Sequence, residues 1–145
     1  MKKLLLLLLL VPGLVLAQPK QTPGVVYDAV ITRVIDGDTV VIAAPYLPAP
    51  LRPELAVRIW GVDTPEKGAL ARCAKERAQA QQATKFVKQA VAQSVDRRVT
   101  LYGWDKYGGR VLGDIVLDGQ SLRGLLIEQG LAREYRGGAR RSWCQ

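Results

Sequence analysis

The chain has 145 residues, a net charge of +8 and no histidine. This length allows one domain with a real hydrophobic core but is too short for two ordinary domains. The missing histidine excludes serine–histidine, cysteine–histidine and ordinary zinc hydrolases, and the basic charge favours a polyanionic partner such as nucleic acid.

The first residues, "MKKLLLLLLLVPGLVLA", have the layout of a secretory signal peptide over residues 1–17, removed after Ala17. The leucine run is too short to span a membrane comfortably, and a retained anchor is the alternative. We therefore expect an exported protein, periplasmic or secreted, with no stable membrane association after cleavage. Residues 18–24 contain two prolines and predict a flexible leader before a domain at 25–145. Without Lys2 and Lys3, 19 basic residues face 13 acidic ones, so the remaining charge is +6.

The two cysteines, Cys73 and Cys144, both lie in the part expected to be exported. An even cysteine count in an exported protein is most simply satisfied by pairing. We predict a Cys73–Cys144 disulfide, with two free thiols as the alternative.

The first half of the predicted domain is rich in strands. Residues 25–44 alternate and contain many β-branched residues around an Asp-Gly pair, which predicts two strands joined by a type I′ turn. Four prolines in residues 44–53 predict a surface loop. The next strand is expected over Leu55–Val62.

The second half begins with a helix. Apolar residues recur at helical spacing within Ala69–Val95 and predict one long amphipathic helix. Two strand patterns, "RRVTLYGW" and "RVLGDIVLDG", follow around the turn "DKYGG". A short helix is predicted after Ser121, its expected N-cap, with its end at Gly130, and the basic tail beyond it is expected to be irregular.

This order predicts an α+β, mainly β fold. The elements fit a closed five-stranded barrel of the OB type, with one long helix after the third strand and a short helix near the C-terminus. Element order alone leaves other small α+β folds open. We expect a monomer.

Charged residues gather where the predicted strands end. Asp38 follows the first turn, and Asp63 and Glu66 end the next strand. A hard cation such as Ca²⁺ prefers oxygen ligands, which Asp38, Asp63 and the carbonyl of Thr64 could supply. Glu66 could then deprotonate a water beside the ion, the general-base task left open by the missing histidines.

Two arginines complete this predicted site. Phosphodiester hydrolysis builds negative charge on phosphorus, and a planar guanidinium offers paired donors to its oxygens. Arg58 lies in an apolar strand, where a charge needs a reason, and Arg110 follows a glycine turn. Each piece also has a plain structural explanation: the Asp-Gly-Asp-Thr stretch is typical of a hairpin turn, and Asp-Thr-Pro-Glu is typical of a helix start. Their joint occurrence in a basic chain favours the site.

Four ordered motifs, "VIDGDTV", "VRIWGVDTPE", "DKYGGRVLGDIVLDG" and "LIEQGLARE", together resemble the thermonuclease (staphylococcal nuclease) family. The resemblance runs from about Val30 to Arg133. It implies an OB-fold, Ca²⁺-dependent endonuclease that cuts DNA and RNA at the bond to the 5′ oxygen with little sequence preference.

The resemblance also implies a role for each matching residue. It assigns calcium binding to Asp38, Asp63 and the carbonyl of Thr64, catalysis to Arg58, Glu66 and Arg110, and contact with a terminal nucleotide phosphate to Lys106 and Tyr107. This chain departs from the family in having two glycines, Gly108 and Gly109, before the second arginine. We interpret the extra glycine as an insertion, because counting back from "LDG" keeps Arg110 in register with its strand.

Two other functions remain open at this point. A non-catalytic OB-type nucleic-acid-binding module is the main alternative, although a binder has no need of two metal aspartates, two arginines and a glutamate. An exported protein that binds another partner is the third possibility. The salt dependence of nucleic-acid binding distinguishes this third possibility from the other two, because binding through phosphates weakens steeply as the salt concentration rises.

Overall fold

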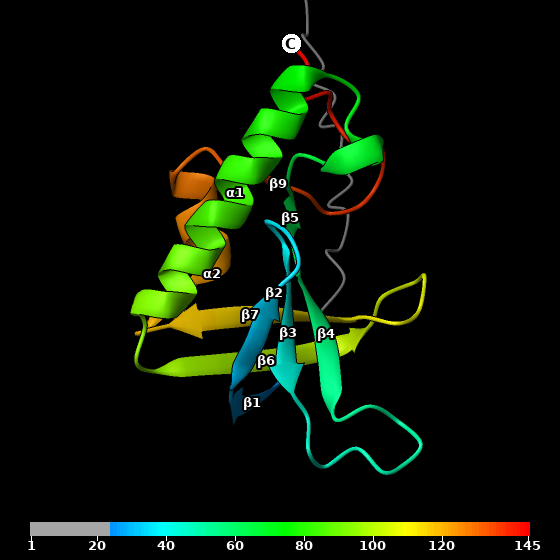
Figure 1. Ribbon diagram of the computed structural model, residues 1–145, viewed down its shortest axis with the longest axis vertical. Helices are drawn as coiled ribbons and strands as arrows, with labels where there is room; N and C mark the ends of the chain where they lie inside the picture. Colours follow the sequence, from blue (N-terminus) through cyan, green and yellow to red (C-terminus); the bar gives the residue numbers. More distant parts are fainter. Residues whose placement is uncertain (1–23) are drawn as a thin grey trace, which may run out of the picture.

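The computed structural model describes residues 24–145. The predicted signal peptide and all but the last residue of the predicted leader therefore lie outside the described residues. Figure 1 shows a mixed α+β fold in which two helices, α1 and α2, lie beside a strongly twisted sheet. The strands are β1 (Val25–Asp28), β2 (Ile31–Val34), β3 (Thr39–Ala43), β4 (Glu54–Ile59), β5 (Val62–Asp63), β6 (Arg97–Trp104), β7 (Val111–Leu117), β8 (Gln120–Ser121) and β9 (Arg133–Glu134). The helices are α1 (Ala74–Gln93), α2 (Leu122–Glu128) and a 3₁₀ turn, η1 (Gly68–Leu70).

The main sheet is open, which corrects the expected closed barrel. Its strand order is β1-β6-β7-β4-β3-β2, with β8 paired to β7 and a separate β5–β9 ladder. The two edge strands, β1 and β2, together make up the first predicted strand. The chain changes partner between them, because Ala29 N–H donates to the Arg97 carbonyl whereas the Val30 carbonyl accepts from Ala43 N–H. Strands β1 and β2 therefore each pair on one side only. The sheet is consistent with an OB-like fold, but it does not close into a barrel.

Helix α1 confirms the predicted long helix but begins later than expected. The residues before it form η1, and Cys73 occupies the N-cap position. Its buried face consists mainly of the small or branched residues Ala80, Ala83, Val87 and Val91. Valine, isoleucine and leucine side chains of β3, β4, β7 and α2 complete the hydrophobic core. In the part of the chain that the structure describes, no helix is long and apolar enough to cross a membrane.

The β2–β3 hairpin was predicted correctly, but its turn type was wrong. A type I′ turn needs positive φ at both central residues, and neither Asp36 nor Gly37 has one. The Asp36 carboxylate instead accepts a hydrogen bond from Asp38 N–H, so that a side chain shapes the loop. A Cβ added at Gly37 would lie 2.8 Å from the Cβ of Ala83 and 3.3 Å from Thr64 side-chain atoms. Glycine is therefore required here by close packing rather than by backbone conformation.

The predicted short helix is present as α2, and Gly130 lies two residues after it with a φ of 68°. Ser121 does occupy the N-cap position, yet its hydroxyl donates to the Asp114 carboxylate and makes no capping hydrogen bond. The tail is irregular except for β9. Figure 1 shows it returning to the N-terminal end of α1, where the predicted Cys73–Cys144 disulfide is present.

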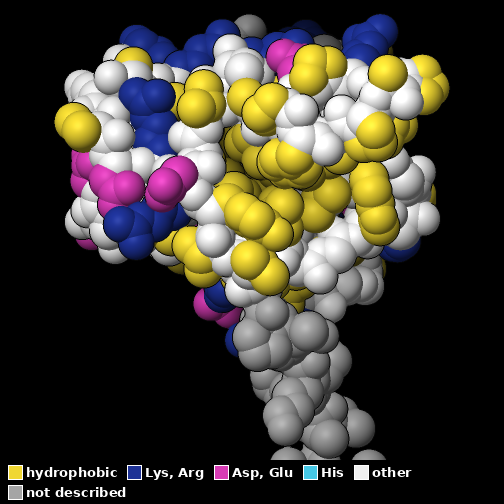
Figure 2. All heavy atoms as spheres, turned by 90° about the horizontal axis from the view of Figure 1, so that it is seen from below, with side chains coloured by type: hydrophobic (Ala, Val, Ile, Leu, Met, Phe, Trp, Pro, Cys, Tyr) yellow, Lys and Arg dark blue, Asp and Glu magenta, His cyan; other side chains and the backbone are white. Residues whose placement is uncertain are grey.

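Figure 2 views the molecule from below and shows hydrophobic side chains gathered on that face. In Figure 1 this is the end of the molecule that carries β1 and the proline-rich loop after β3. Side chains of these segments are indeed exposed: Val25, Val26, Tyr27, Val30, Tyr46 and Leu51. The charged strand ends lie at the opposite end of the β3–β4 hairpin.

Candidate active site

The ends of β3 and β4 meet at a cavity of about 220 Å³, which we name the main cavity. The backbone fixes this meeting, because Ile59 N–H donates to the Asp38 carbonyl at 2.7 Å. Five of the six residues predicted to bind the cation or to act in catalysis line the main cavity: Asp38, Arg58, Thr64, Glu66 and Arg110. The sixth, Asp63, lies beside it and lines a smaller cavity of about 30 Å³ that also includes Thr64.

Asp38 and Arg58 form a nearly buried, two-pronged ion pair. The two guanidinium nitrogens lie 3.1 and 3.0 Å from the two carboxylate oxygens, and the side chains are 13% and 6% exposed for arginine and aspartate. Thr39 Oγ1 also donates to Asp38. Burial raises the pKa of Asp38 to about 6, although Arg58 opposes this effect, and the neighbouring Asp36 adds to it. The strand arginine thus faces the site rather than the core, which explains a charge in an apolar strand.

Asp63 is a buried carboxylate held from the C-terminal tail. Trp143 Nε1–H donates to its Oδ2 at 3.1 Å. Its Oδ1 lies 3.3 Å from Nε of Arg140 but accepts no hydrogen bond. A buried carboxylate oxygen without a hydrogen bond is unusual, and such an atom is suited to binding a cation.

Glu66 is fixed at both its side chain and its backbone. Its Oε1 accepts a hydrogen bond from Arg140, and its N–H donates to the buried carboxylate of Glu76 at 3.3 Å. The other Glu76 oxygen accepts from Arg72 N–H at 2.7 Å. Glu76 therefore fastens the loop that carries Glu66 to the first turn of α1.

Arg110 lies at the main cavity in spite of the two glycines that precede it. Gly108 and Gly109 both have left-handed φ values, 72° and 71°, and Asp105 N–H donates to the Arg110 carbonyl to close the turn. Nη2 of Arg110 lies 2.7 Å from Asp105 Oδ2. Burial would raise the pKa of Asp105, but the hydrogen bond and charge of Arg110 outweigh it and lower that pKa.

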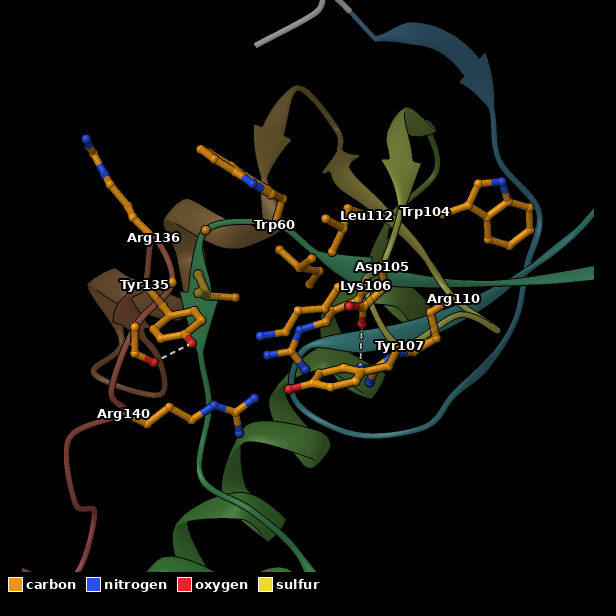
Figure 3. A pocket seen from close by; sticks show the side chains of 16 residues that line it. Trp60, Trp104, Asp105, Lys106, Tyr107, Arg110, Leu112, Tyr135, Arg136 and Arg140 are labelled. Carbon is orange, nitrogen blue, oxygen red and sulfur yellow. Dashed lines mark hydrogen bonds and ion pairs between the residues drawn. The ribbon is translucent and has the colours of Figure 1, made fainter. Parts of the chain in front are cut away.

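A larger groove of about 680 Å³ adjoins the main cavity and shares Arg58, Arg110 and Arg140 with it. Lys106 and Tyr107 line this groove, with the lysine Nζ 4.9 Å from the centre of the tyrosine ring. Figure 3 shows aromatic side chains around it from three segments of the chain, and they are Trp60, Trp104, Tyr107 and Tyr135. Among the described residues its charged lining is mostly basic: Arg58, Lys106, Arg110, Arg136 and Arg140 line it together with a single acidic residue, Asp105.

Sequence reasoning missed the residues that support the site: Glu76, Asp105, Arg140 and Trp143. For the last two a signal was available. The predicted disulfide ties Cys144 to Cys73, which follows the Asp-Thr-Pro-Glu motif closely in the sequence, so residues just before Cys144 had to lie near that motif.

The residues at the main cavity fit a hard cation. Their ligand atoms are carboxylate and carbonyl oxygens, and Asp63, beside this cavity, offers a buried oxygen that faces Arg140 but accepts no hydrogen bond. Among the described residues, Cys73, Glu76 and Cys144 are the single cluster of three side chains with metal-ligand atoms close together. The sulfurs of that cluster are joined in the disulfide, so it offers no thiolate to a metal.

These features define a small mixed α+β protein with a carboxylate-and-arginine site at the ends of its strands, beside a basic, aromatic groove. The chain matches the family of staphylococcal nuclease homologues over residues 56–142, more than half of its length, and it belongs to that family. No curated protein matches it. The matched residues include Arg58, Asp63, Glu66 and Arg110 but not Asp38, which the structure nevertheless places at the main cavity. Family membership supports a nuclease that acts on nucleic acid.

Proposed function

We propose that this protein is an exported, Ca²⁺-dependent endonuclease that hydrolyses phosphodiester bonds of DNA and RNA with little sequence preference. The observation that carries the proposal is the main cavity itself, where Arg58, Arg110 and Glu66 lie around a space that is also lined by the buried residues Asp38 and Thr64. The bond cleaved is the one to the 5′ oxygen, as the family resemblance implies.

The cation would be held by the carboxylates of Asp38 and Asp63 and by the carbonyl of Thr64. When bound, Ca²⁺ supplies positive charge that stabilises the negative charge of the reacting phosphate. Calcium suits this set because it accepts loose, irregular oxygen coordination, whereas Mg²⁺ demands a stricter octahedron.

Glu66 is the general base of the proposed reaction. It accepts the proton of the attacking water, whose oxygen then bonds to phosphorus while the bond to the 5′ oxygen breaks and that oxygen takes a proton from solvent water to leave as an alcohol. Arg58 and Arg110 donate to the phosphate oxygens, where charge grows in the transition state. In the free protein each arginine is paired with its own aspartate, Asp38 or Asp105, so both guanidinium groups are already held at the cavity wall.

The groove supports a substrate strand bound without regard to sequence. Aromatic rings stack on any base, and basic side chains bind any phosphate. Lys106 and Tyr107 project from the β6–β7 turn, where Tyr107 is 76% exposed and available to such a strand. We propose that this pair contacts a terminal phosphate.

Export to a periplasm or secretion from the cell is part of the proposal. The disulfide supports it, because such bonds persist in oxidising compartments and are rare in the cytosol. A monomer is proposed as the active form, since the groove and the main cavity are both formed within one chain.

The test is cleavage of plasmid and single-stranded DNA by residues 18–145, with Ca²⁺, with Mg²⁺ and with a chelator. Cleavage with Ca²⁺ that the chelator abolishes is the expected result. Glu66→Gln and Arg58→Ala should each remove most of it while the circular dichroism spectrum stays unchanged. Arg98→Ala is the matched control, because this exposed arginine pairs with Asp96 and lines neither cavity.

Binding to nucleic acid without cleavage under any ion would instead favour the non-catalytic binding module. Absence of both binding and cleavage from a folded, disulfide-bonded chain would leave the protein as a binder of some other partner.

A further inference from the structure

A third arginine reaches the main cavity from the C-terminal tail. Arg140 donates from Nη1 to Glu66 Oε1, and its Nε lies 3.3 Å from Asp63 Oδ1. Figure 3 shows its side chain extending from the tail toward the side of the groove where Tyr107 and Arg110 lie. Because the Arg140 side chain is 38% exposed, its guanidinium is only partly covered by these two carboxylates.

The tail that carries Arg140 is anchored at several points. Cys144 is bonded to Cys73, and Trp143 is 6% exposed. The guanidinium of Arg133 lies 3.7 Å above the Trp143 ring and donates to the Ser142 carbonyl at 2.9 Å. Arg140 is therefore presented by a fixed wall of the site rather than by a loose chain end.

The position and the donors of Arg140 suit a second phosphate. Arg140 lines both the main cavity and the groove, so it lies where a strand passes from one to the other. A guanidinium has five N–H donors in a fixed plane. Glu66 uses one of them, Nε faces Asp63, and the centre of the Tyr135 ring lies 5.7 Å from the guanidinium carbon. The guanidinium of an arginine keeps its positive charge at ordinary pH, so it is suited to an anionic phosphate.

We propose that Arg140 binds a phosphate of the substrate strand next to the one that is cleaved, and that the Cys73–Cys144 disulfide keeps it in place to do so. This inference rests on the proposed nuclease function, because it concerns the same site. In the free protein Asp63 and Glu66 hold the guanidinium at the junction of the two cavities. A bound strand then receives its remaining donors, so substrate affinity depends on an anchored tail.

The first test measures binding of a single-stranded DNA oligonucleotide by fluorescence anisotropy in chelator, where no cleavage is expected. Each phosphate contact contributes about 0.7 to the slope of log K against log salt for single strands. Arg140→Ala should reduce that slope by about 0.7. Arg140→Lys keeps the charge and should keep the slope, whereas Arg98→Ala should change nothing.

The second test links the arginine to the disulfide. Cys73→Ser/Cys144→Ser should weaken binding and raise KM in the same direction as Arg140→Ala, with both variants checked for folding by circular dichroism. In the binding assay with chelator, combining the three substitutions should add little to Arg140→Ala alone, because without Ca²⁺ the disulfide acts on the strand through this side chain.

The outcomes separate this inference from the proposed function. If the parent protein neither binds nor cleaves DNA, the proposed function fails and this inference fails with it. If the parent cleaves but Arg140→Ala leaves KM and the salt slope unchanged, only the role of Arg140 is overturned. A fall in kcat alone would also overturn it, because Arg140 would then act on Glu66 and not on the strand.

Discussion

Loss of the Cys73–Cys144 disulfide should destabilise the protein more than any single surface substitution. The bridge joins positions separated by 71 residues. The chain-entropy treatment of a loop of that length gives about 4 kcal/mol of stabilisation through the unfolded state. Near this chain length, 1 kcal/mol corresponds to about 4 °C in the midpoint of thermal unfolding. Reduction, or Cys73→Ser/Cys144→Ser, should therefore lower the midpoint by about 15 °C.

The assay is thermal and urea unfolding of the oxidised, reduced and doubly substituted forms, followed by circular dichroism. The oxidised form in a non-reducing buffer is the reference, and the double variant with and without reductant shows whether the reductant itself has an effect. The urea slope should rise on reduction, since the unfolded chain without the cross-link exposes more surface. A reduced form with the same midpoint as the oxidised form would refute the reasoning, because the cross-link would then restrict nothing in the unfolded chain.

Three further changes test how the site is built. Gly37→Ala should cost about 1–3 kcal/mol, measured by urea unfolding, because the new methyl group meets helix α1, whereas Gly103→Ala has nothing within 4 Å and should cost much less. Trp143→Phe should cost about 1–3 kcal/mol, because a buried carboxylate oxygen of β5 loses its hydrogen-bond donor. Asp105→Asn should lower kcat in the parent but not in an Arg110→Ala background. Because the pKa of Asp105 is lowered in the folded protein, its ionised carboxylate stabilises the fold at pH values above the ordinary pKa near 4. This stabilisation is lost as pH falls through the lower pKa of the folded state, so Asp105→Asn should also reduce the drop in stability at acid pH.

The regular elements could be predicted because local pattern and packing agree there. In β7 the burial alternates without a break, and the small apolar residues of α1 recur at helical spacing. The change of partner between β1 and β2 could not be predicted in the same way. The sequence around Ala29 and Val30 does not predict that β1 pairs with β6 whereas β2 pairs with β3. That choice depends on how the whole sheet twists.

The hairpin turn shows a local rule that tertiary packing overrides. The Asp-Gly pair favours a type I′ turn when the strands alone decide. Here Gly37 packs against α1 and Thr64, and this contact leaves no room for a side chain. The next residue, Asp38, lines the main cavity, so the departure from the local rule occurs where the site is built.

Most of the candidate site could be placed from sequence because its residues stand at strand ends, and neighbouring strand ends lie together in any small barrel-like sheet. Arg58 and Asp38 meet because β3 and β4 pair in register, with Thr39 opposite Arg58. The positions of the tail residues Arg140 and Trp143 cannot be predicted from strand ends. Their positions follow only from the disulfide, and a predicted disulfide constrains them only after the Asp-Thr-Pro-Glu loop has been placed beside Cys73.

The buried carboxylates connect the tail to the proposed chemistry. Burial raises the pKa of Asp38 despite its ion pair with Arg58, so its ionised form is costly in the folded protein. Asp63 is equally buried and depends on Trp143 and Arg140, both brought by the tail. A cation held between the two carboxylates would be attracted more strongly than in water, because a buried site has a low dielectric constant, and this attraction would offset the cost of ionising them. Under the proposed function, a tail held by a covalent bond and a buried tryptophan would present the remaining donors of Arg140 to a substrate phosphate while Trp143 continues to hold Asp63 in place.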